Sequence, residues 1–172
     1  MDALPVMIRP ATEADCPRIN AIYNFYVHTS PATFDLVEMT ENWRRDWFEQ
    51  RQRAGLPVLV AEVAGQVAGW CALSPWSPKP AYATTVDESI YIDEQFRGKG
   101  LGRQLLAAIL EEARANGRDV VMAVIVACQE PSLALHRSLG FEQTGLNRHM
   151  GYKLGEWHDV AYLQRHLWRD GS

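Results

Sequence analysis

The segment Phe96–Leu106, FRGKGLGRQLL, joins flexible backbone to positive charge immediately before a leucine-rich run. Its glycines and basic residues alternate closely: Arg97, Gly98, Lys99, Gly100, Gly102 and Arg103. The first N–H groups of a helix lack internal partners, and the helix dipole places partial positive charge there. Glycines let a phosphate approach those amides because no Cβ intervenes. The segment therefore predicts an anion site suited to a pyrophosphate.

Two better-known phosphate motifs do not fit this segment. A nucleotide-hydrolase loop needs G-x-x-x-x-G-K-[ST], and no serine or threonine follows the only Gly-Lys pair, Gly98-Lys99. A dinucleotide fingerprint needs G-x-G-x-x-G, whereas Gly98, Gly100 and Gly102 are each separated by a single residue. The remaining pattern is Arg97-x-x-Gly100-x-Gly102, placed between an expected strand and an expected helix.

Bulk properties restrict the partners of the chain. Its 172 residues suggest a single domain, 1–172, and the net charge of −4 argues against nucleic acid as a partner. The three cysteines are widely spaced and form no CxxC pair, which favours free thiols over disulfides or zinc. No signal peptide is visible in MDALPVMIRP, and no apolar run is long enough to span a membrane. We expect a cytoplasmic protein without membrane contact.

The elements that must position the glycine segment alternate along the chain. Hydrophobic periodicity, caps and turn residues predict helices over 12–29, 41–54, 100–116 and 132–139. Strands are expected over 6–10, 57–63, 66–73, 84–92, 120–126, 142–146 and 159–167, the last region holding two or three strands in all. The apolar run 120–126 is typical of a central strand covered on both faces, and the proline-rich 74–82 of a loop. This order predicts an α/β fold, or α+β in some schemes, with a central mixed sheet.

In this context the glycine segment resembles the coenzyme A pyrophosphate motif of the GNAT acyltransferase superfamily, R/Q-x-x-G-x-G/A. ALHRSLGF, at 134–141, is similar to a second family motif, a short helix that ends in Leu-Gly-Phe. The resemblance implies a GNAT-like fold, a mixed and mostly antiparallel sheet flanked by helices, and acetyl-CoA as co-substrate.

A narrower resemblance covers nearly the whole chain, from Ile8 to Gln164. The segments IRPATEAD, AIYN, SPW, ESIYI, RGKGLG and GYKLGEWHDV are similar, in the same order, to phosphinothricin and methionine sulfoximine N-acetyltransferases. The closing K-x-G-x-W-x-D pattern, from Lys153 to Asp159, is the most specific of these. This resemblance implies acetylation of the amine of a small amino acid, and also a homodimer with GYKLGEWHDV near the shared edge.

The resemblance also implies which residues bind the cofactor. Backbone groups near the pantetheine arm and thioester would come from Ile90, Tyr91 and Ile92, and the pyrophosphate would lie on the segment from Gly98 to Arg103, including Leu101. The side chains of Arg97, Lys99 and Arg103 either join that site or form a solvated basic surface. Gln129 stands where the family usually has an asparagine that contacts the cofactor.

Three residues are candidates for catalysis. An α-amine titrates near pH 8 and must lose a proton before it can attack, and a carboxylate at the pocket can take that proton directly or through water. Asp87 aligns with a family glutamate, and Glu88 is adjacent. Because side chains alternate along a strand, we expect only one of the two to face the substrate. His136 stands where many relatives have a tyrosine near the leaving thiolate, and it is either a proton donor or a packed helix residue.

Substrate contacts are expected from two loops and the start of the cofactor strand. The candidates are Phe34, Trp76, Ser77, Pro78, Lys79, Asp87, Glu88 and Ser89. Relatives often carry a basic residue after the loop tryptophan, where this chain has Ser77, and Lys79 follows two residues later. His158 and Asp159 lack a third ligand at metal-site spacing, so we expect no metal. Acetylation of a protein or another amine, and a coenzyme A-binding domain without catalysis, remain alternatives.

Overall fold

The central element of the fold is one mixed sheet of seven strands in the order β1-β2-β3-β4-β5-β7-β6. The computed structural model describes residues 5–168, so the first four residues of MDALPVMIRP lie outside the described part. The strands are β1 Val6–Pro10, β2 Val58–Val63, β3 Gln66–Pro75, β4 Thr85–Ile92, β5 Val120–Val126, β6 Glu142–Lys153 and β7 Glu156–His166. Among the strands of residues 5–168, only the β4–β5 pair is parallel. The expected mixed, mostly antiparallel sheet is confirmed.

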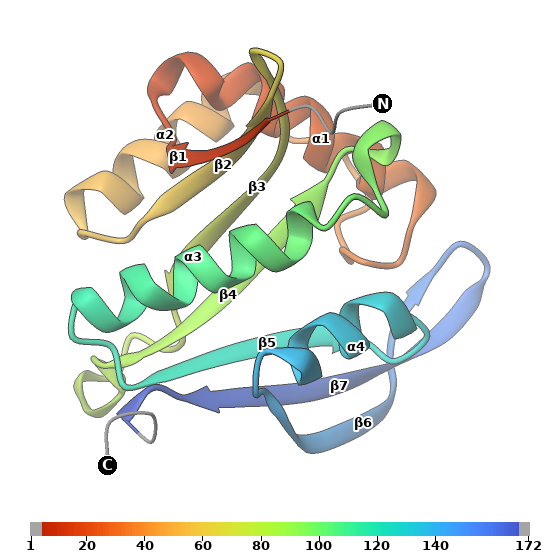
Figure 1. Cartoon of the computed structure of the whole chain (residues 1–172). Coiled ribbons are helices and arrows are strands. Elements are labelled where there is room, and N and C mark those ends of the chain that lie inside the picture. The colour runs from red at the N-terminus through yellow and green to blue at the C-terminus, as the bar shows by residue number, and fades with distance from the viewer. Residues whose placement is uncertain (1–4, 169–172) are drawn as a thin grey trace.

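Four α-helices cover the two faces of this sheet (Figure 1). They are α1 Cys16–Thr29, α2 Glu41–Arg53, α3 Leu101–Ala115 and α4 Glu130–Ser138. One core cluster packs α3 and α4 against the sheet, and a second packs α1 and α2 against the opposite face. Trp70 and Leu73 of β3 belong to different clusters, and both are at most 1% exposed. Among residues 5–168, no helix is long and apolar enough to cross a membrane.

The glycine segment connects β4 to α3 as the sequence predicts. Gly98 and Gly100 have φ angles of +72° and +77°, a left-handed backbone that is strained for other residues. Gly100 is the N-cap of α3, and the following stripe of Leu101, Leu105 and Ile109 is at most 2% exposed. The helix therefore begins at a point fixed by backbone conformation and by burial of its apolar face.

The strands β4 and β5 separate partway along their length. Their parallel pairing covers three positions and ends at Asp87 opposite Met122. Beyond that point β4 stays paired with β3 up to Ile92 opposite Gly69, while β5 stays paired with β7. The inner edges of both strands therefore face a gap. The expectation that β5 is covered on both faces is wrong at Val124, which is 44% exposed beside this gap.

The C-terminal region differs from the prediction of two or three short strands. β6 and β7 form one long antiparallel hairpin, and Leu154 and Gly155 at its turn have φ angles of +54° and +84°. The GYKLGEWHDV segment is therefore the end of this hairpin, which projects beyond the sheet (Figure 1). The proline-rich loop is shorter than predicted, because β3 continues to Pro75 and Pro80–Tyr82 form a 3-10 turn. The helix α4 begins two residues early, with Pro131 in its first turn.

Candidate active site

The gap between β4 and β5 contains a cavity of about 120 Å³. Its walls come from the divergent parts of both strands, from α4 and from Ala32 in the α1–α2 loop. Asp87 and Glu88 both line it, together with Ser89. Both carboxylates line this cavity although they point to opposite faces of the strand, and which of them faces the substrate stays a prediction.

A larger groove of about 620 Å³ adjoins this cavity. The two share Ala32, Ile90, Gln129 and Ser132 as lining residues, so they meet beside β4. The predicted cofactor residues that line the groove are Ile90, Ile92, Arg97, Gly98, Gly100, Leu101, Gly102 and Gln129. The N-terminus of α3 thus lies in the wall of this groove, whose lining also includes β4 residues, which fits an anionic cofactor with a long arm. Tyr91 lines the smaller cavity instead.

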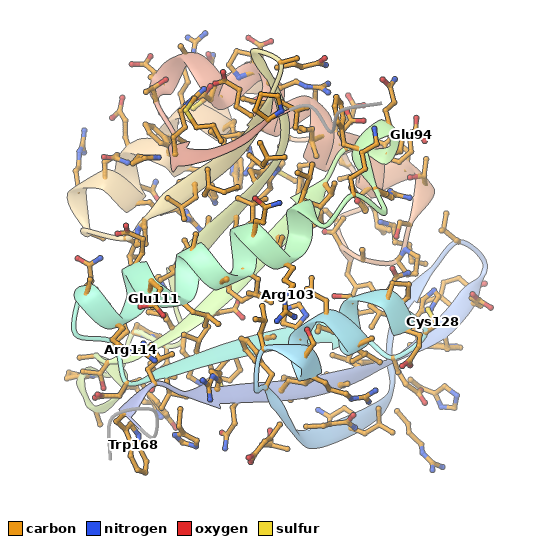
Figure 2. The ribbon with its side chains drawn as sticks, viewed as in Figure 1. Glu94, Arg103, Glu111, Arg114, Cys128 and Trp168 are labelled. Atoms are coloured by element: carbon orange, nitrogen blue, oxygen red, sulfur yellow. The ribbon has the colours of Figure 1, made fainter. Side chains whose placement is uncertain are left out.

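The three basic side chains of the glycine segment have different surroundings. Arg97 lines the groove, with its guanidinium carbon 4.9 Å from the ring centroid of Tyr26. Lys99 donates to the Gln95 carbonyl oxygen at 3.1 Å. Arg103 extends from α3 toward α4 and donates to Ser138 Oγ at 2.7 Å (Figure 2). Of these three side chains Arg97 alone lines the groove, so the backbone amides at the start of α3 are the main other donors available there to an anion.

Asp87 lies at the vertex where β4 and β5 separate. Its Oδ1 atom is buried and accepts no hydrogen bond from the described residues. The pKa of Asp87 is raised to about 7, first by burial and then by the Glu88 carboxylate, against the opposing effect of the Arg51 guanidinium. A carboxylate with a pKa near 7 and a free acceptor atom can take a proton from an amine at neutral pH.

Both carboxylate oxygens of Glu88 have hydrogen-bond partners, whereas Oδ1 of Asp87 has none among the described residues. Its Oε1 lies 2.8 Å from His136 Nε2, and its Oε2 lies 3.9 Å from Cys71 Sγ. The other ring nitrogen of His136, Nδ1, donates to the Ser132 carbonyl oxygen at 2.7 Å. Both nitrogens are therefore committed within the protein. That His136 protonates a leaving thiolate stays a prediction, and it would require one of these bonds to break.

The charge state of His136 follows from the same contacts. Burial acts to lower the pKa of His136, but the Glu88 carboxylate and the hydrogen bonds to Glu88 and Ser132 outweigh it, so the pKa is raised. Because Nδ1 already donates its proton to a carbonyl, Nε2 can donate to Oε1 only when the ring is protonated. The two groups act as one unit beside the cavity.

The predicted substrate residues outside β4 lie away from the cavity. Trp76, Ser77, Pro78 and Lys79 belong to the β3–β4 loop, and Lys79 is exposed. Phe34 packs against Gly151 of β6, where a Cβ atom would come within 2.5 Å of its ring. Of the expected substrate set, only Asp87, Glu88 and Ser89 line the cavity.

The K-x-G-x-W-x-D segment attaches the β6–β7 hairpin to the α1–α2 loop. Lys153 is 4% exposed, and its Nζ donates to the carbonyl oxygens of Thr33 at 2.6 Å and Tyr26 at 3.4 Å. His158 Nε2 in turn donates to the Lys153 carbonyl oxygen at 2.9 Å. The loop held in this way carries Ala32, which lines both cavities.

The sequence analysis missed two arginines on α2. Arg44 is 1% exposed, and Arg51 donates to Ser74 Oγ at 2.6 Å on the same face of the sheet as Asp87. A signal was available, because Arg44 and Arg51 fall at helical spacing with Trp47 and Phe48, with Arg44 buried and Arg51 half-buried. Charged side chains are seldom buried unless they are paired, so an arginine at such a position indicates a specific role. Residues 5–168 contain no group of three His, Cys, Asp or Glu side chains that could hold a metal ion.

Comparison with known proteins agrees with this geometry. The model of the acetyltransferase (GNAT) family matches residues 19–141. An L-methionine sulfoximine/L-methionine sulfone acetyltransferase from Pseudomonas aeruginosa is 42% identical over 161 residues, which cover 93% of this chain and 94% of that protein.

Solved structures give the same result. A GNAT superfamily phosphinothricin acetyltransferase from Sinorhizobium meliloti, in complex with acetyl-CoA, has a TM-score of 0.92 at 35% identity and covers 94% of this chain and 88% of its own. A ribosomal-protein-alanine N-acetyltransferase from Brucella melitensis has a TM-score of 0.91 at 41% identity, covering 93% and 99%. With the groove at the start of α3 and the family match over most of its length, the chain belongs to the acetyltransferase (GNAT) family and is an acetyl-CoA-dependent N-acetyltransferase.

Proposed function

We propose that this enzyme acetylates the α-amine of a small L-amino acid or analogue, with methionine sulfoximine, methionine sulfone and phosphinothricin as the leading candidates. The observation that carries the proposal is Asp87, a buried carboxylate with a pKa of about 7 at the junction of a small cavity and a long groove. The names of the relatives at about 40% identity support the same substrate class.

The reaction proceeds by direct attack of the amine. Acetyl-CoA, when bound along the groove, supplies the acetyl carbonyl carbon. Asp87 accepts a proton from the α-ammonium group, whose pKa near 8 lies within reach of a carboxylate at about 7. The neutral nitrogen forms the amide bond, and coenzyme A leaves as a thiolate that takes up one proton. The inner edge of β4 beyond Asp87 pairs with no strand of residues 5–168, so its backbone groups are available to the pantetheine arm.

Asp87 is favoured over Glu88 as the base. Both oxygens of Glu88 have partners, His136 and Cys71, whereas Oδ1 of Asp87 has none among the described residues. The Glu88 carboxylate raises the pKa of Asp87, and the bond to His136 holds that carboxylate in place. We assign them a positioning role.

The size of the cavity favours a free amino acid over a peptide. A volume of about 120 Å³ accommodates a small side chain, whereas a peptide needs an open channel. The second candidate, acetylation of a protein N-terminus, is favoured by the Brucella melitensis neighbour, whose name specifies a ribosomal-protein-alanine substrate.

Measuring coenzyme A release separates the two candidates. The panel contains the three analogues, free methionine, a peptide with N-terminal alanine and a peptide with an internal lysine. We expect the highest kcat/KM for one of the free amino acids. Faster turnover of either peptide than of every free amino acid would refute the proposed substrate class.

We further propose a single-domain homodimer in the cytoplasm that binds no nucleic acid. The β6–β7 hairpin exposes a set of large apolar side chains, each 46–58% exposed: Leu146, Met150, Tyr152, Leu154 and Trp157. Exposed apolar patches of this kind support association of protein surfaces. The free cysteines suit a reducing compartment.

A further inference from the structure

The helix α2 places two arginines, Arg44 and Arg51, against the face of the sheet that holds Asp87. Arg44 lies among four aromatic rings, with its guanidinium carbon 4.6–5.5 Å from the centroids of Tyr23, Trp43, Trp47 and Trp70. Within residues 5–168, neither Arg44 nor Arg51 has a carboxylate oxygen within 4.0 Å of its nitrogens. Burial lowers the pKa of each to about 10. Arg44 is buried and Arg51 is half-buried, and a cation withdrawn from water without an anionic partner is costly, so this region favours an incoming anion.

The guanidinium of Arg51 is held in one orientation by three contacts. Its central carbon lies 4.0 Å from the ring centroid of Trp47, and Nη1 donates to the Trp47 carbonyl oxygen at 3.2 Å. Nη2 donates to Ser74 Oγ at 2.6 Å. Its Nε is buried and has no hydrogen-bond partner among the described residues. Nη1 and Nη2 each use one N–H in these bonds, so three of the five N–H donors of the guanidinium remain, and arginine usually recognises a carboxylate through two parallel N–H···O bonds.

The contact with Ser74 places this guanidinium beside Asp87. Ser74 of β3 and Asp87 of β4 are directly opposite in the antiparallel ladder, so their side chains lie on the same face about 5 Å apart. Arg51 and Asp87 accordingly influence each other's pKa, yet they form no ion pair. Two neighbouring groups of opposite charge therefore each keep a buried polar atom unused, Nε on one and Oδ1 on the other.

We propose that Arg51 binds the α-carboxylate of the amino-acid substrate while Asp87 receives its α-amine. In an α-amino acid one carbon separates these two groups, so their partners must be neighbours, as Arg51 and Asp87 are. Ser77, a loop position expected to supply a cation, is uncharged, and neither Lys79 nor Arg51 itself lines the cavity. Arg51 is, however, the cation that acts on Asp87, which does line it. Arg44, which is buried among aromatic rings of α1, α2 and β3, adds positive potential at this site without contacting the substrate. The proposal rests on the proposed function.

The test compares two substrates that differ only in the carboxylate. These are L-methionine sulfone and 3-(methylsulfonyl)propylamine, the same molecule without its carboxylate. We expect Arg51→Met to lower kcat/KM for the amino acid at least 30-fold, mainly by raising KM. The same variant should change kcat/KM for the amine less than 3-fold. Arg51→Lys, which keeps the charge without the fork, should fall in between. Arg53→Met is the matched control, because Arg53 has a 79% exposed side chain on the same helix and should affect neither substrate.

Folding is checked by circular dichroism and by acetyl-CoA affinity, which Arg51→Met should leave unchanged. If that variant does not fold, Ser74→Ala, which frees Nη2 of Arg51, should selectively weaken turnover of the amino acid instead. Equal losses of kcat/KM for both substrates would overturn the role of Arg51 but not the proposed function. The same holds if the parent enzyme has equal kcat/KM values for the amino acid and the amine. A parent enzyme that acetylates no free amino acid would overturn the proposed function, and the carboxylate site with it.

Discussion

Nε2 of His136 lies 2.8 Å from Oε1 of Glu88, and the two side chains are 1% and 4% exposed. This buried bond joins α4 to β4 directly beneath the candidate base. Glu88 is thereby fixed as a charge next to Asp87 rather than as a group that can approach a substrate. The adjacent carboxylates, equivalent in the sequence, thus have different environments in the fold.

Replacement of each carboxylate should separate the two roles. Asp87→Asn removes the proton acceptor and should lower kcat/KM by about 10²–10⁴-fold. In the parent enzyme, kcat/KM should rise with pH through about 7, where Asp87 deprotonates, and the variant should lose this limb. Glu88→Gln should keep the limb but move it to lower pH, because the charge that raises the pKa of Asp87 is gone. Identical profiles for the parent and both variants would show that deprotonation occurs elsewhere.

The same carboxylate should make stability depend on pH. The folded-state pKa of Asp87 is raised from 3.8 to about 7, so between these values the native state binds more protons than the unfolded state. The contribution of this group to stability therefore falls as pH rises from about 4 to 7, and ionised Asp87 destabilises the fold above 7. Asp87→Asn should raise Tm at pH 8 relative to the parent by several degrees. The difference should disappear below pH 4, and a Tm difference independent of pH would contradict the assignment.

The positive-φ glycines before α3 allow a controlled test of the cofactor groove. Gly100→Val should weaken acetyl-CoA binding more than tenfold, about 1.4 kcal/mol, because it places a branched side chain at the groove and strains a φ of +77°. Gly117→Val is the matched control, since Gly117 has a φ of +69° at the other end of the same helix. It should lose similar stability and keep its affinity in calorimetry. Equal affinity losses would mean that strain, and not the groove, is responsible.

The glycine segment and the helix it starts were predictable because their signals are local. Three glycines and a leucine stripe fix where α3 begins, whatever packs around them. The gap between β4 and β5 was not predictable in this way, because it depends on pairing between distant segments. Where the two strands separate, β4 stays paired with β3 and β5 stays paired with β7. Arg51 was missed for the same reason, since only the β3–β4 register shows that Ser74 brings it beside Asp87.

The role of Lys153 is another long-range relationship that the motif alone did not reveal. Its ammonium group is 127 and 120 residues away in sequence from the two carbonyl groups it binds, those of Tyr26 and Thr33. Lys153→Met should leave both carbonyl groups without this donor and destabilise the protein by about 1–3 kcal/mol in urea unfolding. It should also raise the KM for the acceptor, because the loop with Ala32 is released. Lys79→Met, at an exposed position, should change neither quantity.

The exposed face of the β6–β7 hairpin should control the oligomeric state. Tyr152 and Trp157 are opposite each other in the ladder, their ring centroids are 5.5 Å apart, and their exposed fractions are 57% and 58%. If this pair lies in the dimer interface, Trp157→Glu buries a charge against the partner and should give a monomer in light scattering at micromolar concentration. Trp168→Glu is the control, because Trp168 is 58% exposed and lies far from the tip of the hairpin (Figure 2). It should leave the dimer intact. A parent protein that is already monomeric, or a Trp157→Glu variant that remains dimeric, would show that the hairpin face is not the interface.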